Sequence, residues 1–93
     1  MVIKKYRKKP VDVSAFYISN FSDEVISALE KFCEGNLEME VKHGSYNKIF
    51  IRTLEGRYEV KPTNYMIRGI VGEFYPCQEE IFHKTYEEIN DQA

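Results

Sequence analysis

One segment of this chain carries both a start signal and a stop signal for a helix, and it constrains the fold more than any other feature. Ser22 can cap the first free amide groups, and Asp23 and Glu24 suit the positive end of a helix dipole. Gly35 stands where a left-handed residue would end the helix. The segment predicts a helix over residues 22–34, with apolar residues at helical spacing: Val25, Ile26, Leu29, Phe32 and Cys33. Such a stripe needs a sheet to pack against.

Strand patterns lie on both sides of this helix. β-Branched and aromatic residues dominate residues 11–19, which predicts a strand. Apolar and charged residues alternate over 37–42, which is the period of a strand with one solvent-exposed face. Residues 43–47 supply a turn. A further turn is expected over 62–64, and the tail over 79–89 has the spacing of a short helix or helical turn.

Two hairpins are predicted in the second half of the chain. One has a two-residue turn at Glu55 and Gly56. The register that follows has three facing pairs: Thr53 with Tyr58, Arg52 with Glu59, and Ile51 with Val60. The other joins residues 65–70 to 74–77 around Gly72 and Glu73, where glycine in the first position suits a type II′ turn.

Together these elements predict an α+β fold in one domain over residues 1–93. The chain is 43% apolar and contains seven tyrosines and six phenylalanines, enough for one compact core at this size. We expect a curved antiparallel sheet of about five strands packed on one main helix, with a short C-terminal helical segment. Residues 1–9 form a basic N-terminal arm outside this body.

The charge of the chain is unevenly distributed. Five cations fall within the first nine residues, and the remaining chain has 8 basic and 15 acidic residues, a net charge of −7. The basic arm, with Tyr6 among its cations, suits short contacts with phosphate groups. A body of this charge would repel an extended DNA or RNA, whereas a compact anionic ligand such as a nucleotide needs only a few cations and an aromatic surface. A solvated arm without a ligand is the alternative.

Residue types that carry catalysis are sparse. Only His43 and His83 could act as imidazole bases, and neither lies beside a nucleophile motif such as G-x-S-x-G. With Cys33 and Cys77 these histidines are numerically sufficient for zinc, but no C-x-x-C or H-x-x-x-H pair brings two ligands together. The sequence therefore predicts no enzyme, no metal site and no cofactor.

The sequence also suggests where the protein works. No apolar run at the N-terminus has the length of a signal peptide, and no later segment approaches membrane-spanning length. The two cysteines are expected to be buried, reduced thiols. We therefore expect a cytoplasmic protein without a membrane partner.

A second candidate patch lies in the last predicted hairpin, where Tyr65, Arg68, Phe74 and Tyr75 stand close to two glycines. An arginine and aromatic rings beside a closely approached backbone would suit a ligand or a protein interface, and core packing is the alternative. Combined with the arm, the candidate ligand-binding residues are Lys5, Arg7, Lys8, Lys9, Tyr65, Arg68 and Tyr75.

Motifs at both ends of the chain carry a resemblance to a protein family. They are Lys5-Tyr-Arg-Lys-Lys-Pro-Val11, then Asn64-Tyr-Met-Ile-Arg-Gly-Ile-Val-Gly-Glu-Phe-Tyr-Pro-Cys77, and Ile81-Phe82 with Thr85-Tyr86. They resemble a family of small, uncharacterised bacteriophage and prophage proteins, which typically show K-Y-R-K-K-P at the start and P-G-D-Y-I-I-K-G-V-K-G-E-F-Y-P-C near the end. Here Thr63 and Asn64 replace Gly and Asp of that turn, so no role for the turn carboxylate is carried over.

The resemblance implies a phage or prophage origin and a setting in the bacterial host cytoplasm. Small phage accessory proteins often act by binding, so we expect a protein that inhibits a host protein or sequesters a small nucleotide-like ligand, including a defence signal. The alternatives are a structural or assembly protein of the phage particle and short-range nucleic-acid binding through the basic arm. A chain with a basic start and an acidic end can also pair with a copy of itself as a homodimer.

Overall fold

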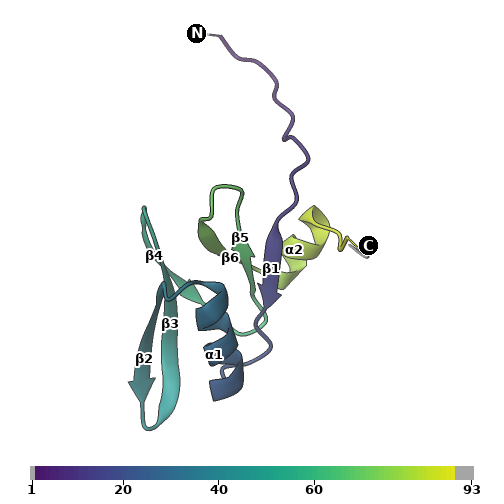
Figure 1. The fold of residues 1–93 in the computed structure, drawn as a ribbon. Coiled ribbons are helices and arrows are strands. Elements are labelled where there is room, and N and C mark those ends of the chain that lie inside the picture. The colour runs from purple at the N-terminus through teal and green to yellow at the C-terminus, as the bar shows by residue number, and fades with distance from the viewer. Residues whose placement is uncertain (1, 90–93) are drawn as a thin grey trace.

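The computed structural model describes residues 2–89 and has an α+β architecture (Figure 1). The elements in chain order are β1 (Ser14–Tyr17), α1 (Asp23–Phe32), β2 (Leu37–Lys42), β3 (Ser45–Thr53), β4 (Gly56–Val60), β5 (Tyr65–Arg68), β6 (Phe74–Cys77) and α2 (Glu79–Thr85). The coarse α+β prediction is confirmed. Residues 2–13, which precede β1, extend away from the body as a segment without helix or strand.

The single sheet of about five strands is wrong, because the described strands form two antiparallel sheets of three. Their orders are β1-β5-β6 and β2-β3-β4. The strands divide into two sheets because of the turn after β4. There Thr63 has a φ of 71°, and its amide donates to the Ile18 carbonyl at 2.6 Å. The Ile18 amide donates in return to the Asn64 carbonyl at 2.9 Å. The turn thus delivers β5 to β1 instead of letting it continue the ladder of β4.

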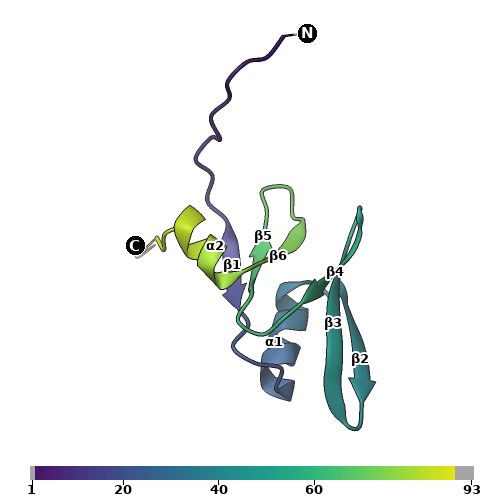
Figure 2. The same cartoon turned by 180° about the vertical axis from the view of Figure 1, so that it is seen from behind.

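Helix α1 lies between the two sheets, and α2 lies on the far side of the β1-β5-β6 sheet (Figures 1 and 2). The predicted cap is present, since the Ser22 hydroxyl accepts a hydrogen bond from the Val25 amide at 3.3 Å. The helix is shorter than the expected 22–34, because Glu34 (φ 54°) and Gly35 (φ 80°) both adopt the left-handed conformation that ends a helix.

The expected strand over 37–42 and helix in the tail are both present, and the expected strand over 11–19 is reduced to β1. The turn over 43–47 is narrower than predicted. His43 (φ 54°) and Gly44 (φ 75°) alone form a two-residue turn between β2 and β3, with Lys42 opposite Ser45.

The predicted register of the β3–β4 hairpin is wrong by two residues. Ile51 faces Tyr58 rather than Val60, and Thr53 faces Gly56, so the turn residues are Leu54 and Glu55. Gly56 closes the hairpin with a φ of 120°, where a side chain is strained. The Thr53 hydroxyl donates to the Gly56 carbonyl at 2.7 Å and accepts from the Glu55 amide at 3.2 Å, which fixes this turn in place of the predicted one.

The β5–β6 hairpin also turns differently from the prediction. Arg68 faces Phe74, so five residues, 69–73, connect the two strands rather than the expected Gly72 and Glu73. The Gly69 amide donates to the Glu73 carbonyl at 2.7 Å, and the Gly72 amide donates to the Gly69 carbonyl at 3.1 Å. These bonds make a wider loop whose apolar tip, Ile70 and Val71, is exposed.

The core lies where α1 meets the two sheets. Its fully buried side chains come from α1 and the residue that caps it, from the loop after β1 and from β3, β4 and β5: Ile18, Ile26, Leu29, Cys33, Ile49, Ile51, Val60 and Met66. Burial raises the pKa of the Cys33 thiol to about 12, partly countered by the positive charge of Arg68. Cys33 is therefore the buried thiol expected from the sequence, whereas Cys77 is half-buried.

Replacing Leu29 by alanine should leave a cavity in this core. We expect Leu29→Ala to lower the free energy of unfolding by about 2–5 kcal/mol, measured by urea denaturation. The matched control is Leu54→Ala, the same chemical change at the fully exposed tip of the β3–β4 hairpin, which should alter stability by less than about 0.5 kcal/mol. Equal losses in the two variants would contradict the core described here.

Candidate functional site

Side chains of β5 alternate between two surroundings. Pairing places Tyr65 and Ile67 on the same face as Tyr75 of β6, whereas Met66 and Arg68 share the opposite face with Phe74. The first face meets α2, and the second meets α1 and the core. The residues of the second candidate patch are therefore divided between the two sides of the sheet.

An aromatic cluster covers the face that meets α2. Tyr65 stacks on Phe82 of α2 with ring centroids 3.9 Å apart and planes within 7°. Phe82 stacks in turn on Tyr86 at 5.0 Å, and Tyr17 of β1 lies 4.9 Å from Tyr65. His83 meets Tyr65 edge-on, with its Nε2 3.4 Å from the tyrosine hydroxyl. We define the aromatic cluster as Tyr17, Tyr65, Phe82, His83 and Tyr86.

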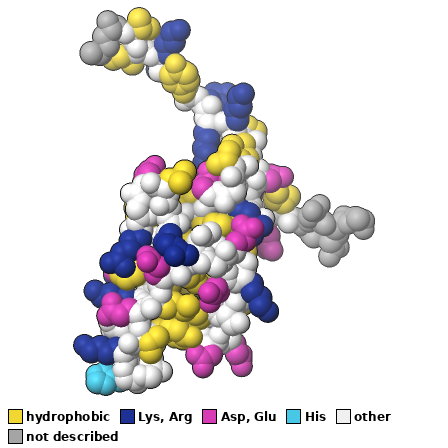
Figure 3. Space-filling model, turned by 60° about the vertical axis from the view of Figure 1, so that its left-hand side comes forward, with side chains coloured by type: hydrophobic (Ala, Val, Ile, Leu, Met, Phe, Trp, Pro, Cys, Tyr) yellow, Lys and Arg dark blue, Asp and Glu magenta, His cyan; other side chains and the backbone are white. Residues whose placement is uncertain are grey.

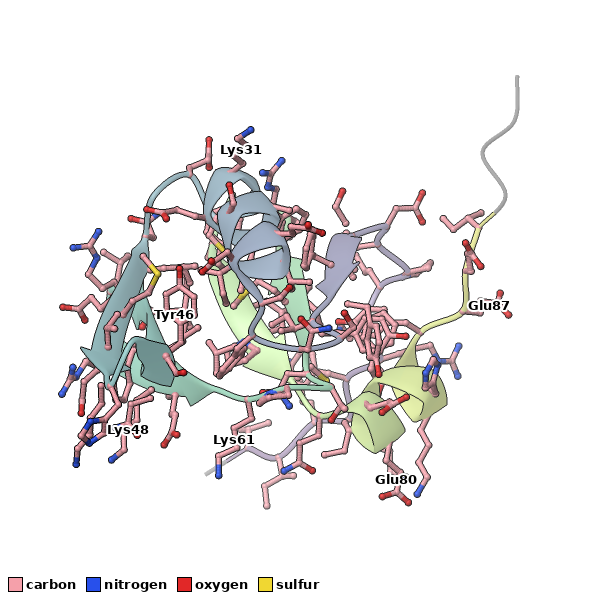
Figure 4. The ribbon with its side chains drawn as sticks, turned by 90° about the horizontal axis from the view of Figure 1, so that it is seen from below. Lys31, Tyr46, Lys48, Lys61, Glu80 and Glu87 are labelled. Atoms are coloured by element: carbon pink, nitrogen blue, oxygen red, sulfur yellow. The ribbon has the colours of Figure 1, made fainter. Side chains whose placement is uncertain are left out.

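A hollow of about 1250 Å³ opens beside this cluster. Its walls are residues 8–15, both ends of β5 with the first two residues of the loop that follows, and the segment from Phe82 of α2 to residue 89. Lys8 and Lys9 contribute positive charge, and Asp12, Glu87 and Glu88 contribute negative charge. Figure 4 shows Glu87 on the chain that follows α2 and Glu80 at the outer side of α2. The hollow thus joins the root of the basic arm to the aromatic cluster.

The four candidate cations of the basic arm fall into two groups. The Lys8 ammonium lies 5.6 Å from the centre of the Tyr86 ring, a cation–π contact that ties the arm to the cluster, and Lys9 lines the hollow beside it. Lys5 and Arg7 lie outside the residues that line the hollow, on the exposed part of the arm. Figure 3 shows this part projecting from the body with its blue side chains in solvent.

The guanidinium of Arg68 is turned toward α1, although Arg68 is among the residues that line the hollow. Its Nη2 donates to the Phe32 carbonyl at the end of α1 at 2.8 Å. The guanidinium lies 5.0 Å from the centre of the Phe32 ring and 5.3 Å from that of Phe74. Its Nε is buried and has no hydrogen-bond partner within residues 2–89. Arg68 therefore holds β5 against the C-terminal end of α1.

Tyr75 does not line the hollow, and its hydroxyl contacts that of Tyr86, which does. The two hydroxyl groups lie 3.4 Å apart, and Tyr75 is half-buried beneath α2. Burial, and then the hydrogen bond to Tyr86, raise the pKa of Tyr75 to about 12. Burial and the nearby Glu79 carboxylate raise the pKa of Tyr65 as well. Both phenols stay neutral at physiological pH, so they act here as aromatic surfaces and neutral hydrogen-bonding groups.

Of the predicted site residues, Lys8, Lys9, Tyr65 and Arg68 line the hollow, although the guanidinium of Arg68 is bonded to the end of α1. The structure adds Phe82 and Tyr86, which were not predicted as site residues, and His83, which was considered only as a catalytic base or zinc ligand. Phe82 and Tyr86 are four residues apart on one helical face, a spacing that was used only to predict the helical segment in the tail. His43 lies in the turn between β2 and β3. Within residues 2–89 no three His, Cys, Asp or Glu side chains gather where they could hold a metal ion.

Comparison with protein families, with curated proteins and with solved structures found no match to this chain. The two helices of the described chain are too short to cross a membrane. The functional assignment therefore depends on the arrangement of residues around the hollow.

Removing the guanidinium of Arg68 should weaken the junction between β5 and α1. We expect Arg68→Met to lower the free energy of unfolding by about 1–3 kcal/mol, because the Phe32 carbonyl loses its charged donor. Urea denaturation measures the change, and Lys61→Met, the same new side chain at an exposed position, is the control. A variant as stable as the wild type would contradict a structural role for Arg68.

The raised pKa of Tyr75 predicts a loss of stability at high pH. A phenol with a pKa near 10 in the unfolded chain and about 12 in the folded one contributes stability fully below pH 10, and loses it as pH rises to about 12. In Tyr75→Phe the free energy of unfolding should fall less steeply over this range. Urea denaturation across a pH series tests it, with Tyr6→Phe on the exposed arm as control. If the free energy of unfolding fell equally with pH in wild type and Tyr75→Phe, the raised pKa of Tyr75 would be contradicted.

Proposed function

We propose that this is a phage accessory protein that acts by binding in the host cytoplasm, and that its hollow takes a small nucleotide-like anion. The observation that carries the proposal is the meeting of Lys8 and Lys9 with the aromatic cluster around one hollow. Aromatic faces bind a nucleobase whatever its identity, and the two ammonium groups neutralise phosphate. The resemblance of the two end motifs to phage and prophage proteins supports the biological setting.

The size of the hollow favours a ligand larger than a single phosphate. Its volume of about 1250 Å³ lies above the range of about 300–1,000 Å³ that is typical of small-molecule pockets. A nucleotide or a dinucleotide fits such a space. One wall belongs to the extended segment before β1, which contributes no residue to the buried core.

The charges around the hollow favour a ligand with few phosphate groups. The hollow is lined by two cations, Lys8 and Lys9, and by three carboxylates, Asp12, Glu87 and Glu88, so each further phosphate charge adds repulsion and a triphosphate is disfavoured most. Carboxylates accept hydrogen bonds from sugar hydroxyls and from the amino groups of bases. We therefore infer a preference for cyclic nucleotides and monophosphates over triphosphates.

The chemistry around the hollow favours binding over turnover. Within residues 2–89 the hydrogen bond of His83 goes to the hydroxyl of Tyr65, a phenol whose pKa is raised and which is therefore a poor nucleophile. Sequestration of a ligand needs affinity and no reaction. We infer that the protein lowers the free concentration of its ligand in the host.

A host protein is the second candidate ligand, favoured by exposed apolar side chains at two hairpin tips. Leu54 at the tip of β3–β4 is fully exposed, and Ile70 and Val71 at the tip of β5–β6 are 69% and 79% exposed. Figure 1 shows the two tips at the same end of the molecule. Apolar anchors of this kind suit a protein interface.

A thermal-shift screen against cyclic mononucleotides, cyclic dinucleotides, nucleoside monophosphates and triphosphates tests the proposal. A ligand at a hundred times its dissociation constant adds about 2.7 kcal/mol, which raises Tm by roughly 10 °C or more for a domain of this size. We expect the largest shift from a cyclic nucleotide or a monophosphate and the smallest from a triphosphate.

Charge-reversed variants locate the site. Lys8→Glu/Lys9→Glu should abolish the shift, whereas Lys31→Glu/Lys61→Glu, with the same change in net charge, should keep it. Figure 4 shows Lys31 at the end of α1 and Lys61 beyond β4, each pointing into solvent. No shift across the panel would reject the nucleotide and favour a host protein, and an equal shift in both variants would reject the hollow as the site.

A further inference from the structure

Part of the basic arm has no role in the hollow. Lys5, Tyr6 and Arg7 lie on the extended segment beyond Lys8, and the Tyr6 side chain is 89% exposed. Ile3 near the start of the arm is 87% exposed. A segment that is already extended and presents both cations and apolar side chains has the composition of a strand without a partner.

The β2-β3-β4 sheet has an edge that such a strand would fit. β2 is an outer strand of this sheet, so one side of its backbone is unpaired within the described chain. Met39 and Val41 are 37% and 60% exposed on one face of β2, and the carboxylates of Glu38 and Glu40 lie on the other. Open edges with exposed apolar side chains are usually covered in native proteins.

We propose that the basic arm of a second copy of this chain adds to the outer edge of β2 as an antiparallel strand. In this register Lys5 lies opposite Glu40 and Arg7 lies opposite Glu38. Tyr6 then lies opposite Met39, because alternate residues point to opposite faces. One register therefore forms two pairs of opposite charge and covers an exposed apolar side chain.

The carboxylates of β2 have room for these partners. Within residues 2–89 neither Glu38 nor Glu40 forms a salt bridge, and Glu40 only accepts a hydrogen bond from the Asn47 side chain at 2.9 Å. On the inner side of β2, Lys48 of β3 stands opposite Glu40. A cation from the arm on the outer side would give a row of alternating charge across three strands, the arrangement that stabilises neighbouring strands. Figure 3 shows basic and acidic side chains interspersed on this side of the body.

The other three outer strands of the two sheets lack this complementarity. β1 and β6 carry no carboxylate, and β4 carries only Glu59, two residues from Arg57 on the same strand. A second copy also fits better than the same chain, because the arm leaves from β1 and points away from the β2-β3-β4 sheet (Figures 1 and 2). When each of two copies gives its arm to the other, the two contacts are equivalent and the assembly closes as a dimer.

The exchange is separate from ligand binding in the hollow. It uses Lys5, Tyr6 and Arg7, while Lys8 and Lys9 remain beside the aromatic cluster. A dimer can therefore be present whether or not the hollow binds a nucleotide, and the two proposals fail independently.

Charge reversal with cross-complementation tests the exchange, with mass measured by sedimentation velocity over a wide range of protein concentration. The wild type should be a dimer that dissociates on dilution. Lys5→Glu/Arg7→Glu and Glu38→Lys/Glu40→Lys should each raise the dissociation constant at least about tenfold, because opposite charges become like charges at both contacts. An equimolar mixture of the two variants should regain the dimer, since each arm then meets an edge of opposite charge.

The mixture also controls for folding, because only folded chains can restore each other. Lys31→Glu/Lys61→Glu, which changes net charge by the same amount as the arm variant, should remain a dimer. A wild type that stays monomeric at all concentrations would overturn the proposal. So would an arm variant that dimerises like the wild type, or a mixture that stays as monomeric as its components.

Discussion

The alternation of side chains along β5 is the constraint on which the rest of the structure depends. β5 is the central strand of its sheet, and its two faces are covered by α1 with the core on one side and by α2 on the other. Met66 enters the core beneath α1, and Arg68 reaches the carbonyl of Phe32 on the same side. Tyr65, one residue away from Met66, stacks on Phe82 of α2 on the other side. A single four-residue strand therefore positions both helices, and the hollow lies where its outer face meets the root of the arm.

The sequence predicted the elements that depend on local chemistry and missed those that depend on pairing. The α1 cap at Ser22 follows from the hydroxyl itself, and the ends of β2 follow from its alternation. The register of β3 and β4 was out by two residues, a shift that leaves every side chain on the same face, so no apolar pattern distinguishes the two registers. The division into two sheets depends on the pairing of β1 with β5, which residues 18–64, about half of the chain, separate.

The candidate site was predicted only in part, because it too depends on contacts between distant parts of the chain. Lys8, Lys9 and Tyr65 do meet at the hollow. Tyr65 and Arg68 are separated by an odd number of positions, so a strand places their side chains on opposite faces. This division could have been predicted from the sequence. The stacking of Tyr65 on Phe82 was not, because it depends on where α2 lies after the chain leaves β6.

The gathering of cations in an arm outside the body has an electrostatic consequence for both proposals. Without the first nine residues the chain carries a net charge of −7, so two bodies repel each other and each repels an anionic ligand. Cations spread over the body would weaken the repulsion of every partner equally and would favour none of them. Cations on an extended segment can instead be placed against a chosen partner, with Lys8 and Lys9 at the hollow and Lys5 and Arg7 free to meet the carboxylates of β2. The arm therefore divides into a root that belongs to its own body and a free part suited to another, and the cation–π contact between Lys8 and Tyr86 marks the boundary.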